Sequence, residues 1–361
     1  MKESKRYLVT GGAGFVGSNL VDELLRRGHR VRVLDNLTSG SLENLSESLS
    51  SIEFIKGDIR DTWTVREAVE GCDYILHQAA LVSVPHSIQN PQTTNAINVT
   101  GTLNLLEAAR EFRIKRFVFA SSSAVYGDSD TLPITEKTIP APLSPYAVSK
   151  LSAEWCTSVY SKVYGLPTVS LRYFNIFGPR QSPESDYAAV VPRFIQVISN
   201  GSNPIVYGDG KQTRDFIYIS NAVSANLLSV ESDQAIGGVY NVGCGNKFTL
   251  NTLIEKLEKI NGVQIYPNHQ AERPGDIMHS FADISRARLD LNYRPLVNFE
   301  DGLRMTTEWF KRKEKTIESG PITQLLKGSR IKIPESLTFH DDDTITSALL
   351  GTGKSRRSKG G

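Results

Sequence analysis

Short apolar runs alternate with helical patterns along the first half of the chain. The strand-like runs are residues 7–10, 31–34, 52–55, 74–77 and 117–120. Between them, residues 18–27 carry leucine and valine at helical spacing, and residues 93–112 predict a longer helix. Apolar strands separated by helices are typical of a parallel sheet covered on both faces. The pattern predicts an α/β fold with a doubly wound parallel sheet, whose ligands bind at the carboxyl ends of the strands.

The rhythm changes after residue 175. Irregular segments there are interrupted by Pro179, Pro183, Pro192 and Pro204, and we expect a smaller α/β substrate-binding domain. Residues 216–219 and 239–242 look like strands that rejoin the main sheet. The predicted organisation is a first domain over residues 1–174 with returning segments at about 216–243, a second domain over 175–215 and 244–312, and a charged, largely disordered tail over 313–361.

A glycine run connects the first strand to the first helix. Gly11, Gly14 and Gly17 stand at three-residue spacing; they allow a tight turn, close approach to a pyrophosphate, and packing of helix on strand. The second strand ends at Asp35 and Asn36, about twenty residues further on, where a carboxylate can accept hydrogen bonds from an adenosine ribose. Because this carboxylate would repel a 2′-phosphate, the sequence predicts a Rossmann-type site for NAD rather than NADP.

Further candidates stand at the ends of the next strands. Asp58 is either a group that meets the adenine edge or an ordinary acidic turn residue. Ala79 and Ala80 are small enough to let the backbone crowd a bound cofactor. The serines at residues 121–123 form either a polar turn or a hydroxyl partner for a substrate oxygen.

A tyrosine and a lysine then stand one helical turn apart. Ser144 is suited to cap this helix and Pro145 to occupy its first position. Tyr146 and Lys150 lie four residues apart and therefore side by side. A neighbouring cation lowers the pKa of a phenol, so the pair is either a general base, Tyr146, with its tuner, Lys150, or a chance spacing of the kind that many helices contain.

Composition excludes several functions. The 361 residues have 41 basic and 39 acidic side chains, and this balance argues against a nucleic-acid binder. Three dispersed cysteines suggest neither disulfides nor zinc, and a reducing cytosol fits best. No apolar run is long enough to cross a bilayer, and the N-terminus leaves no room for a signal peptide. We expect a cytoplasmic protein without metal, membrane or nucleic-acid partners.

The order of the motifs adds a family resemblance. They are residues 11–17, 35–36, 78–80, 121–123, Tyr146 with Lys150, 171–175, 208–210, 213–216 and 273–276. In this order they resemble the extended short-chain dehydrogenase/reductase family, and within it the UDP-hexose 4-epimerases, particularly the group acting on UDP-N-acetylglucosamine. The resemblance runs from about residue 5 to about residue 311.

The resemblance implies a role for each matching residue. The implied catalytic residues are Tyr146, Lys150, Ser122 and Ser123. The residues implied to bind NAD are Gly11, Gly14, Phe15, Val16, Gly17, Asp35, Asn36, Ser39, Gly40, Asp58, Ile59, Gln78, Ala79, Ala80, Asn98, Tyr146, Lys150 and Tyr173. The residues implied to bind the UDP-sugar are Ser83, Ser122, Ser123, Tyr146, Asn175, Val191, Tyr207, Arg214, Arg273, Asp276 and Ser280. Two arginines suit a diphosphate, which a nearly neutral protein must bind with local charge.

The implied reaction inverts carbon 4 of the sugar through a transient 4-ketose. Related dehydratases carry an Asp-Glu pair, and decarboxylases a Glu, where this chain has Ser123 and Ala124; the elimination therefore lacks an obvious acid or base. The remaining alternatives are a UDP-glucuronate 4-epimerase, a nucleotide-sugar dehydratase of the same family and a non-catalytic NAD-binding regulator. Ser280 is small where the family meets the C2 substituent, which predicts that UDP-N-acetylglucosamine is accepted and leaves UDP-glucose open. Family analogy also implies a homodimer through the 93–112 helix and the helix that carries Tyr146.

Overall fold

The computed structural model of the chain describes residues 3–183, 189–272 and 277–319. Contacts group the chain into two compact units, Met1–Lys311 and Arg312–Gly361, and the fold described below is that of the first unit. Among the described residues, no helix combines the length and apolar character needed to cross a membrane.

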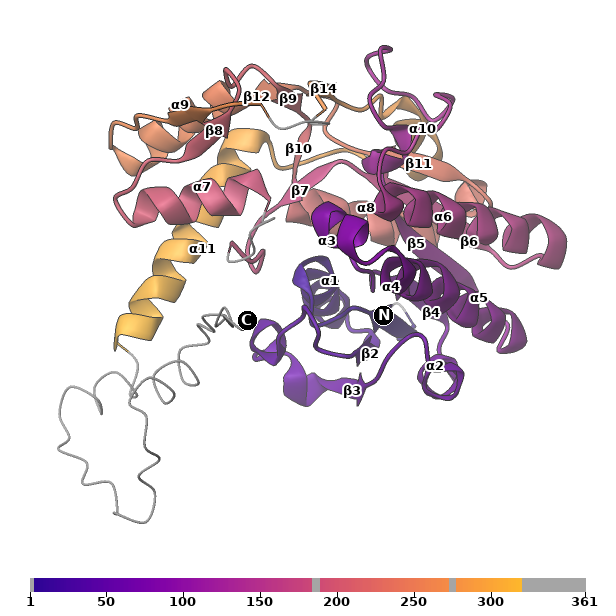
Figure 1. Cartoon of the computed structure of the whole chain (residues 1–361). Helices are drawn as coiled ribbons and strands as arrows, with labels where there is room; N and C mark the ends of the chain where they lie inside the picture. Colours follow the sequence, from indigo (N-terminus) through magenta and orange to yellow (C-terminus); the bar gives the residue numbers. More distant parts are fainter. Residues whose placement is uncertain (1–2, 184–188, 273–276, 320–361) are drawn as a thin grey trace, which may run out of the picture. The chain divides into compact units, whose positions relative to one another are not determined.

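A seven-stranded parallel sheet forms the centre of the first unit (Figure 1). Its spatial order is β11-β6-β5-β4-β1-β2-β3. The bounds are β1 (Arg6–Thr10), β2 (Arg30–Asp35), β3 (Ile52–Lys56), β4 (Tyr74–His77), β5 (Arg116–Ser122), β6 (Thr168–Tyr173) and β11 (Val239–Val242). The strand order reverses between β1 and β4, and ligands of such sheets bind at the carboxyl ends beside that point. The predicted doubly wound fold is confirmed.

Helices cover both faces because successive strand residues point to opposite sides. Val9 and Val118 pack in one apolar cluster with α1 and α8, whereas Leu8 and Phe117 pack in a second cluster with α2, α5 and α6. The bounds are α1 (Phe15–Arg26), α2 (Thr62–Val69), α3 (Val84–Gln89), α4 (Pro91–Asn95), a π turn (Ala96–Thr100), α5 (Gly101–Glu111), α6 (Pro145–Tyr164) and α8 (Ile219–Glu231). The short 3₁₀ helices are Leu42–Leu45, Leu49–Ser51, Ser123–Tyr126 and Asp233–Ala235.

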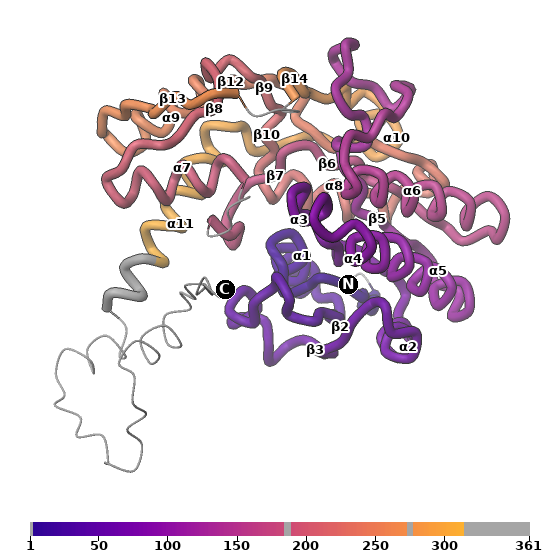
Figure 2. Tube along the Cα trace, in the orientation of Figure 1, coloured from indigo at the N-terminus to yellow at the C-terminus, as the bar shows by residue number. Residues whose placement is uncertain are grey.

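The remaining elements form three small sheets with four helices. The pairs are β7 (Asn175–Phe177) with β10 (Phe216–Tyr218), β12 (Phe248–Thr249) and β14 (His279–Ser280) with β9 (Thr213–Arg214), and β8 (Ile205–Tyr207) with β13 (Asn268–Gln270). The helices are α7 (Val190–Ser199), α9 (Leu250–Asn261), α10 (Ser285–Leu291) and α11 (Phe299–Ser319). Figure 2 shows the small sheets gathered together although their strands are far apart in the sequence.

Two further expectations can be compared with the structure. The 93–112 helix is confirmed as α4, a π turn and α5 in succession. Residues 239–242 rejoin the main sheet as predicted, but residues 216–218 do not: β10 pairs with β7 in a separate sheet. An apolar run of this length is compatible with either sheet, so the sequence could not decide between them. The division of residues 1–311 into two domains stays a prediction.

Candidate active site

The glycine loop, residues 11–17, turns β1 into α1 and has no room for a Cβ at Gly11 or Gly17. Gly11 has φ +66°, and a Cβ on it would lie 2.8 Å from the backbone of Ala79. A Cβ on Gly17 would overlap the carbonyl oxygen of Gly11. Gly14 is the N-cap of α1 and makes no side-chain hydrogen bond. The first N–H groups of α1 are therefore available to an anion such as a pyrophosphate.

Asp35 ends β2 and is only 8% exposed. Its Oδ2 accepts the Ala13 N–H at 2.9 Å, and its Oδ1 accepts the Leu37 N–H at 2.8 Å. Gly40 crosses the same loop so closely that a Cβ on it would lie 2.9 Å from the carbonyl carbon of Ala13. Each carboxylate oxygen can accept a second hydrogen bond. The predicted ribose acceptor thus also fixes the position of the glycine loop.

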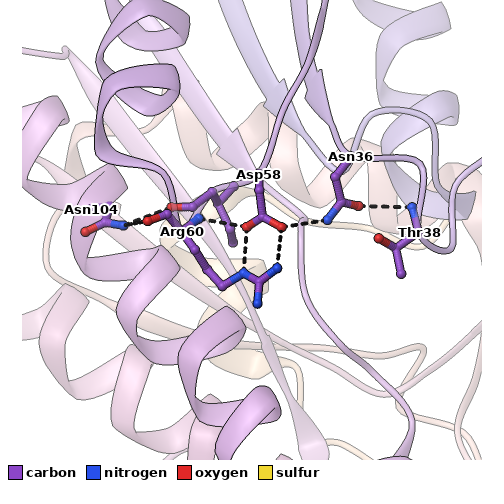
Figure 3. A network of polar contacts seen from close by, with 6 residues as sticks. Asn36, Thr38, Asp58, Arg60 and Asn104 are labelled. Carbon is purple, nitrogen blue, oxygen red and sulfur yellow. Dashed lines mark hydrogen bonds and ion pairs between the residues drawn. The ribbon is translucent and has the colours of Figure 1, made fainter.

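Asp58 follows β3 and belongs to a polar network beside the end of β2 (Figure 3). Arg60 donates to both carboxylate oxygens, at 2.9 and 2.8 Å, and Asn36 donates to Oδ2 at 2.9 Å. The Arg60 guanidinium holds the pKa of Asp58 well below its usual range. From α5, Asn104 donates to the carbonyl oxygens of Ile59 and Arg60. The network keeps Asp58 ionised, and its contact with the adenine edge stays a prediction. Ser39, another predicted NAD residue, is exposed.

Gln78 follows β4, and Tyr173 ends β6. The structure joins these two residues through Asn226, which the sequence did not single out. Asn226 Nδ2 on α8 donates to the Tyr173 hydroxyl at 2.7 Å, and Gln78 Nε2 donates to Asn226 Oδ1 at 3.1 Å. Burial raises the pKa of Tyr173 to about 12. Asn226 lies in a helix without any motif, so no sequence signal identified it.

His77, at the end of β4, was also missed. It is 1% exposed and lies between two threonine hydroxyls, with Thr10 Oγ1 at 2.7 Å from Nδ1 and Thr102 Oγ1 at 2.9 Å from Nε2. Thr102 donates its own hydrogen to the carbonyl oxygen of Asn98. It must therefore accept from His77 Nε2–H, which leaves Nδ1 as the acceptor for Thr10. Burial lowers the pKa of His77 to about 3, so the ring is neutral.

Asn98 lies in the π turn and connects this histidine network to α6. Its side chain accepts from Leu81 N at 2.8 Å, and its Nδ2 donates to the Leu81 carbonyl and to Ser149 Oγ. Ser149 in turn donates to the backbone carbonyl of Tyr146 at 2.7 Å. A π turn widens a helix locally and is common at functional sites. Here the π turn lets the side-chain amide of Asn98 hold both the segment that follows β4 and the start of α6.

Tyr146 and Lys150 lie on the buried face of α6. Tyr146 is hydrogen-bonded to Ser122, yet burial outweighs that contact and raises the pKa of the phenol. Lys150 Nζ donates to the Ala120 carbonyl at 2.7 Å and lies 5.0 Å from the centre of the Phe119 ring. Burial lowers the pKa of this ammonium to about 7. The structure thus differs from the expectation that Lys150 lowers the pKa of Tyr146.

The three serines that end β5 divide into two roles. Ser121 donates to Glu154 Oε2 at 2.6 Å, and Glu154 forms a buried bidentate ion pair with Arg172. Ser122 caps the following 3₁₀ helix, and Ser123 begins it. The structure therefore joins Ser122 to Tyr146 and uses Ser121 to hold β5 against α6 and β6. The sequence did not identify Glu154, because a sequence does not show whether an acidic residue is buried or exposed.

On the other side of the site, two of the predicted substrate residues are direct neighbours. Ser280 pairs with Arg214 in the register of β14 and β9, and Ser280 is only 8% exposed. Arg214 NH1 donates to the carbonyl oxygen of Thr213 at 2.9 Å. Asn175 begins β7, and its N–H donates to the Asp215 carbonyl at 3.1 Å. The structure therefore brings Asn175, Arg214 and Ser280 into one group around residue 215.

Other predicted substrate residues are more scattered. Ser83 is the N-cap of α3, where its Oγ accepts from His86 N. Val191 is buried in the apolar core on α7. Tyr207 ends β8, and its carbonyl accepts from Gln212. The last two predicted substrate residues, Arg273 and Asp276, lie outside the described residues.

The observed contacts fit a dinucleotide. Phe15 and Val16 open α1 and pack against the core, and Ala79 and Ala80 follow β4 without bulky side chains. The glycine loop rejects a Cβ, the helix N-terminus is uncapped, and an acidic residue ends β2. These features are those of the Rossmann site for NAD. Within the described residues, no group of three His, Cys, Asp or Glu side chains forms a metal site.

Comparisons with known proteins agree with this site. The sequence model of the NAD dependent epimerase/dehydratase family matches residues 7–243. The UDP-N-acetylglucosamine 4-epimerase of Methanobrevibacter ruminantium, solved in complex with UDP-N-acetylmuramic acid, is 43% identical. Its TM-score is 0.83, and the match covers 86% of this chain and 99% of that one.

Two further similar proteins frame the range of functions. The UDP-glucose 4-epimerase of Thermus thermophilus, solved with NAD, is 37% identical with a TM-score of 0.77, and the match covers 85% of this chain and 99% of that one. A dTDP-glucose 4,6-dehydratase of Streptomyces niveus is 36% identical over 316 residues, which cover 85% of this chain and 93% of that protein. Similar identity therefore accompanies two different reactions, and the site residues must decide between them.

Proposed function

We propose that this chain, which belongs to the NAD dependent epimerase/dehydratase family, inverts carbon 4 of a UDP-hexose. The observation that carries this proposal is the composition of the site around Tyr146. The phenol is hydrogen-bonded to Ser122, and the next two residues are Ser123 and Ala124 rather than acids. Removing water from a sugar needs an additional acid and base, and the assigned catalytic residues, all of which the structure describes, supply hydroxyls, a phenol and an ammonium.

The chemistry assigned to the chain is proton transfer and orientation. When bound, NAD supplies the reversible hydride acceptor at the sugar carbon. Tyr146 takes the proton of the 4-hydroxyl and later returns it to the same oxygen, while Ser122 holds that oxygen by a hydrogen bond. Lys150, on the same buried face of α6, is held by the Ala120 carbonyl and carries a positive charge when protonated. That charge favours the phenolate once substrate is bound.

We propose UDP-N-acetylglucosamine and its galacto epimer as substrates. Ser280 pairs with Arg214 on adjacent short strands, so a residue with a small side chain stands next to the arginine that we assign to the diphosphate. A small residue leaves room for an N-acetyl group, whereas a large aromatic one would fill it. The similar protein from Methanobrevibacter ruminantium is named for the same sugar nucleotide. UDP-glucose is the second candidate, and UDP-glucuronate the third.

The deciding experiment incubates the protein separately with UDP-N-acetylglucosamine, UDP-glucose and UDP-glucuronate and follows the anomeric protons by NMR. We expect a galacto signal to appear with the first sugar nucleotide. Tyr146→Phe should lower its rate by about 10²- to 10⁴-fold because the proton acceptor is lost. Tyr164→Phe, on the exposed end of the same helix, is the matched control and should keep its rate.

Two results would reject this function. Conversion of none of the three sugar nucleotides would exclude the epimerase, and a 4-keto-6-deoxy product would indicate a dehydratase. Full activity in Tyr146→Phe would remove the assigned base.

We also propose a homodimer that covers the outer face of α6. Val148, Trp155, Val159 and Val163 are 50%, 58%, 49% and 66% exposed, and their spacing places them on one side of the helix. Contiguous exposed apolar residues mark interaction surfaces. Trp155→Glu should convert the dimer to a monomer in sedimentation experiments, whereas Trp63→Glu on α2, 79% exposed, should not. A wild-type monomer would contradict the proposal.

A further inference from the structure

Asp215 is a buried carboxylate that the proposed chemistry does not use. It lies between β9 and β10, is fully buried, and accepts three backbone hydrogen bonds. The donors are Cys244 N at 2.8 Å to Oδ1, Gly245 N at 3.0 Å to Oδ2, and Ala282 N at 3.2 Å to Oδ2. A buried carboxylate is costly unless such donors compensate it.

The three donors come from segments that are otherwise separate. Cys244 and Gly245 follow β11 of the main sheet, and Ala282 follows β14 of a small sheet. The backbone of Asp215 also accepts the N–H of Asn175, which begins β7. One residue therefore joins the main sheet to two of the small sheets.

The space around this carboxylate is closed. A Cβ on Gly243 would lie 2.6 Å from Asp215 Oδ2, so only glycine fits there while the carboxylate keeps its position. Tyr293 donates its hydroxyl to the Gly243 carbonyl at 3.0 Å and holds the same turn from the other side. The carboxylate is therefore held in one position both by its hydrogen-bond donors and by close packing against the turn at Gly243.

We propose that Asp215 is a positioning residue that sets the geometry of the UDP-sugar subsite. Three predicted substrate residues lie close to Asp215, either along the chain or near the groups that its hydrogen bonds join. Arg214 precedes it, Asn175 is bonded to its carbonyl, and Ser280 stands two residues before Ala282. Moving the carboxylate moves β9, β7 and β14 relative to one another. This inference rests on the proposed function, because it assigns Arg214 and Ser280 to the substrate.

A carboxylate suits this role better than its amide isostere. Three N–H groups need three acceptor positions, which the two oxygens of Asp215 supply. An asparagine offers one oxygen, and its NH₂ group would face at least one of the three N–H donors. A buried donor left without an acceptor is destabilising, so the segments are expected to separate in the variant.

The test compares Asp215→Asn with wild type by calorimetric titration with UDP and by steady-state kinetics with UDP-N-acetylglucosamine. We expect the Kd for UDP and the KM to rise about tenfold or more. We expect kcat to stay within about threefold and the NAD content to match wild type, because Tyr146 and the glycine loop have no contact with Asp215 that would carry the change. Asp301→Asn, an exposed acid on α11, is the control and should change neither constant.

A second variant covers the case in which Asp215→Asn does not fold. Gly243→Ala keeps the carboxylate but pushes against Oδ2, and it should raise the same two constants while NAD content is unchanged. A folded variant with unchanged Kd for UDP, or with lower kcat at unchanged KM, would overturn the inference. A wild-type protein that binds UDP but converts no sugar nucleotide refutes the proposed function alone, whereas one that does not bind UDP refutes both.

Discussion

The proposed cofactor side and the proposed substrate side of this site are built in different ways. The cofactor side uses the ends of strands in one parallel sheet, and residues at these strand ends, such as Gly11 and Asp35, set its turns. The substrate side uses strands of two or three residues, and β9, β12 and β14 come from three distant parts of the chain. The cofactor side therefore has many redundant backbone contacts, whereas the substrate side depends on a few long-range ones.

The buried ionisable groups of the two sides show the same contrast. On the cofactor side, His77 is neutral and lies between two hydroxyls, in the strand β4 that the sheet already fixes. On the substrate side, Asp215 accepts three N–H groups, although burial raises the pKa of its carboxyl to about 6. We expect substitutions on the cofactor side to affect NAD or stability, and those on the substrate side to affect affinity and choice of sugar.

The largest effect is expected from Gly17→Ala. This variant tests whether NAD binding can be lost while UDP binding is kept. The new Cβ overlaps the Gly11 carbonyl, so the glycine loop must move. Overpacking of this kind costs about 1–3 kcal/mol of unfolding free energy. The purified variant should contain little NAD, measured after denaturation by absorbance, while its Kd for UDP stays near the wild-type value.

Gly28→Ala provides the control for this experiment. Gly28 lies just beyond the other end of α1 with φ +80° and open space around it. The alanine variant should lose some stability through its backbone conformation but keep its NAD. Equal loss of NAD in both variants would show that general destabilisation, rather than the loop, controls cofactor binding.

A smaller effect, on sugar choice, is expected from Ser280→Tyr. The added ring would fill the space beside Arg214, so conversion of UDP-N-acetylglucosamine should fall relative to UDP-glucose by about tenfold to a hundredfold. NAD content should not change. Ser285→Tyr, at the exposed start of α10, serves as the control. If the ratio of kcat/KM for the two sugar nucleotides is unchanged, Ser280 does not border the C2 substituent.

Backbone elements and side-chain contacts differ in how far the sequence predicts them. The strands, the glycine loop and the Tyr146/Lys150 pair follow from local spacing, which a sequence shows directly. The side-chain partners of His77, Asn226 and Asp215 do not, because the residues of these contacts are as much as 148 positions apart. No periodicity encodes such pairs, and only the folded sheet brings them together.

Ionisation was the least predictable property. The sequence placed a cation beside Tyr146 and therefore indicated a lowered pKa. In the fold, Lys150 donates to the Ala120 carbonyl and burial dominates both groups, so the pKa of Tyr146 rises and that of Lys150 falls to about 7. Burial depends on the whole packed core, and the spacing of two residues on a helix does not report it.

The smallest effect on ligand binding is expected from His77→Gln, which concerns the pH dependence of stability instead. The pKa of His77 is about 3 in the folded protein, against an ordinary value of 6.5. In the unfolded chain, His77 therefore takes up a proton below about pH 6.5. In the folded protein it does so only near pH 3. Wild type thus loses unfolding free energy as the pH falls through this window, and by about pH 4 the loss from this residue approaches about 3 kcal/mol.

Glutamine keeps one donor and one acceptor for Thr102 and Thr10 but does not titrate. His77→Gln should be less stable than wild type at neutral pH, because the ring no longer packs against Phe117 and Phe119, and this deficit should shrink as the pH approaches about 4. Urea unfolding at several pH values measures it, with exposed His269→Gln as the control. A deficit that is constant with pH would mean that His77 is not held neutral by burial, and the contrast with the carboxylate of Asp215 would be lost.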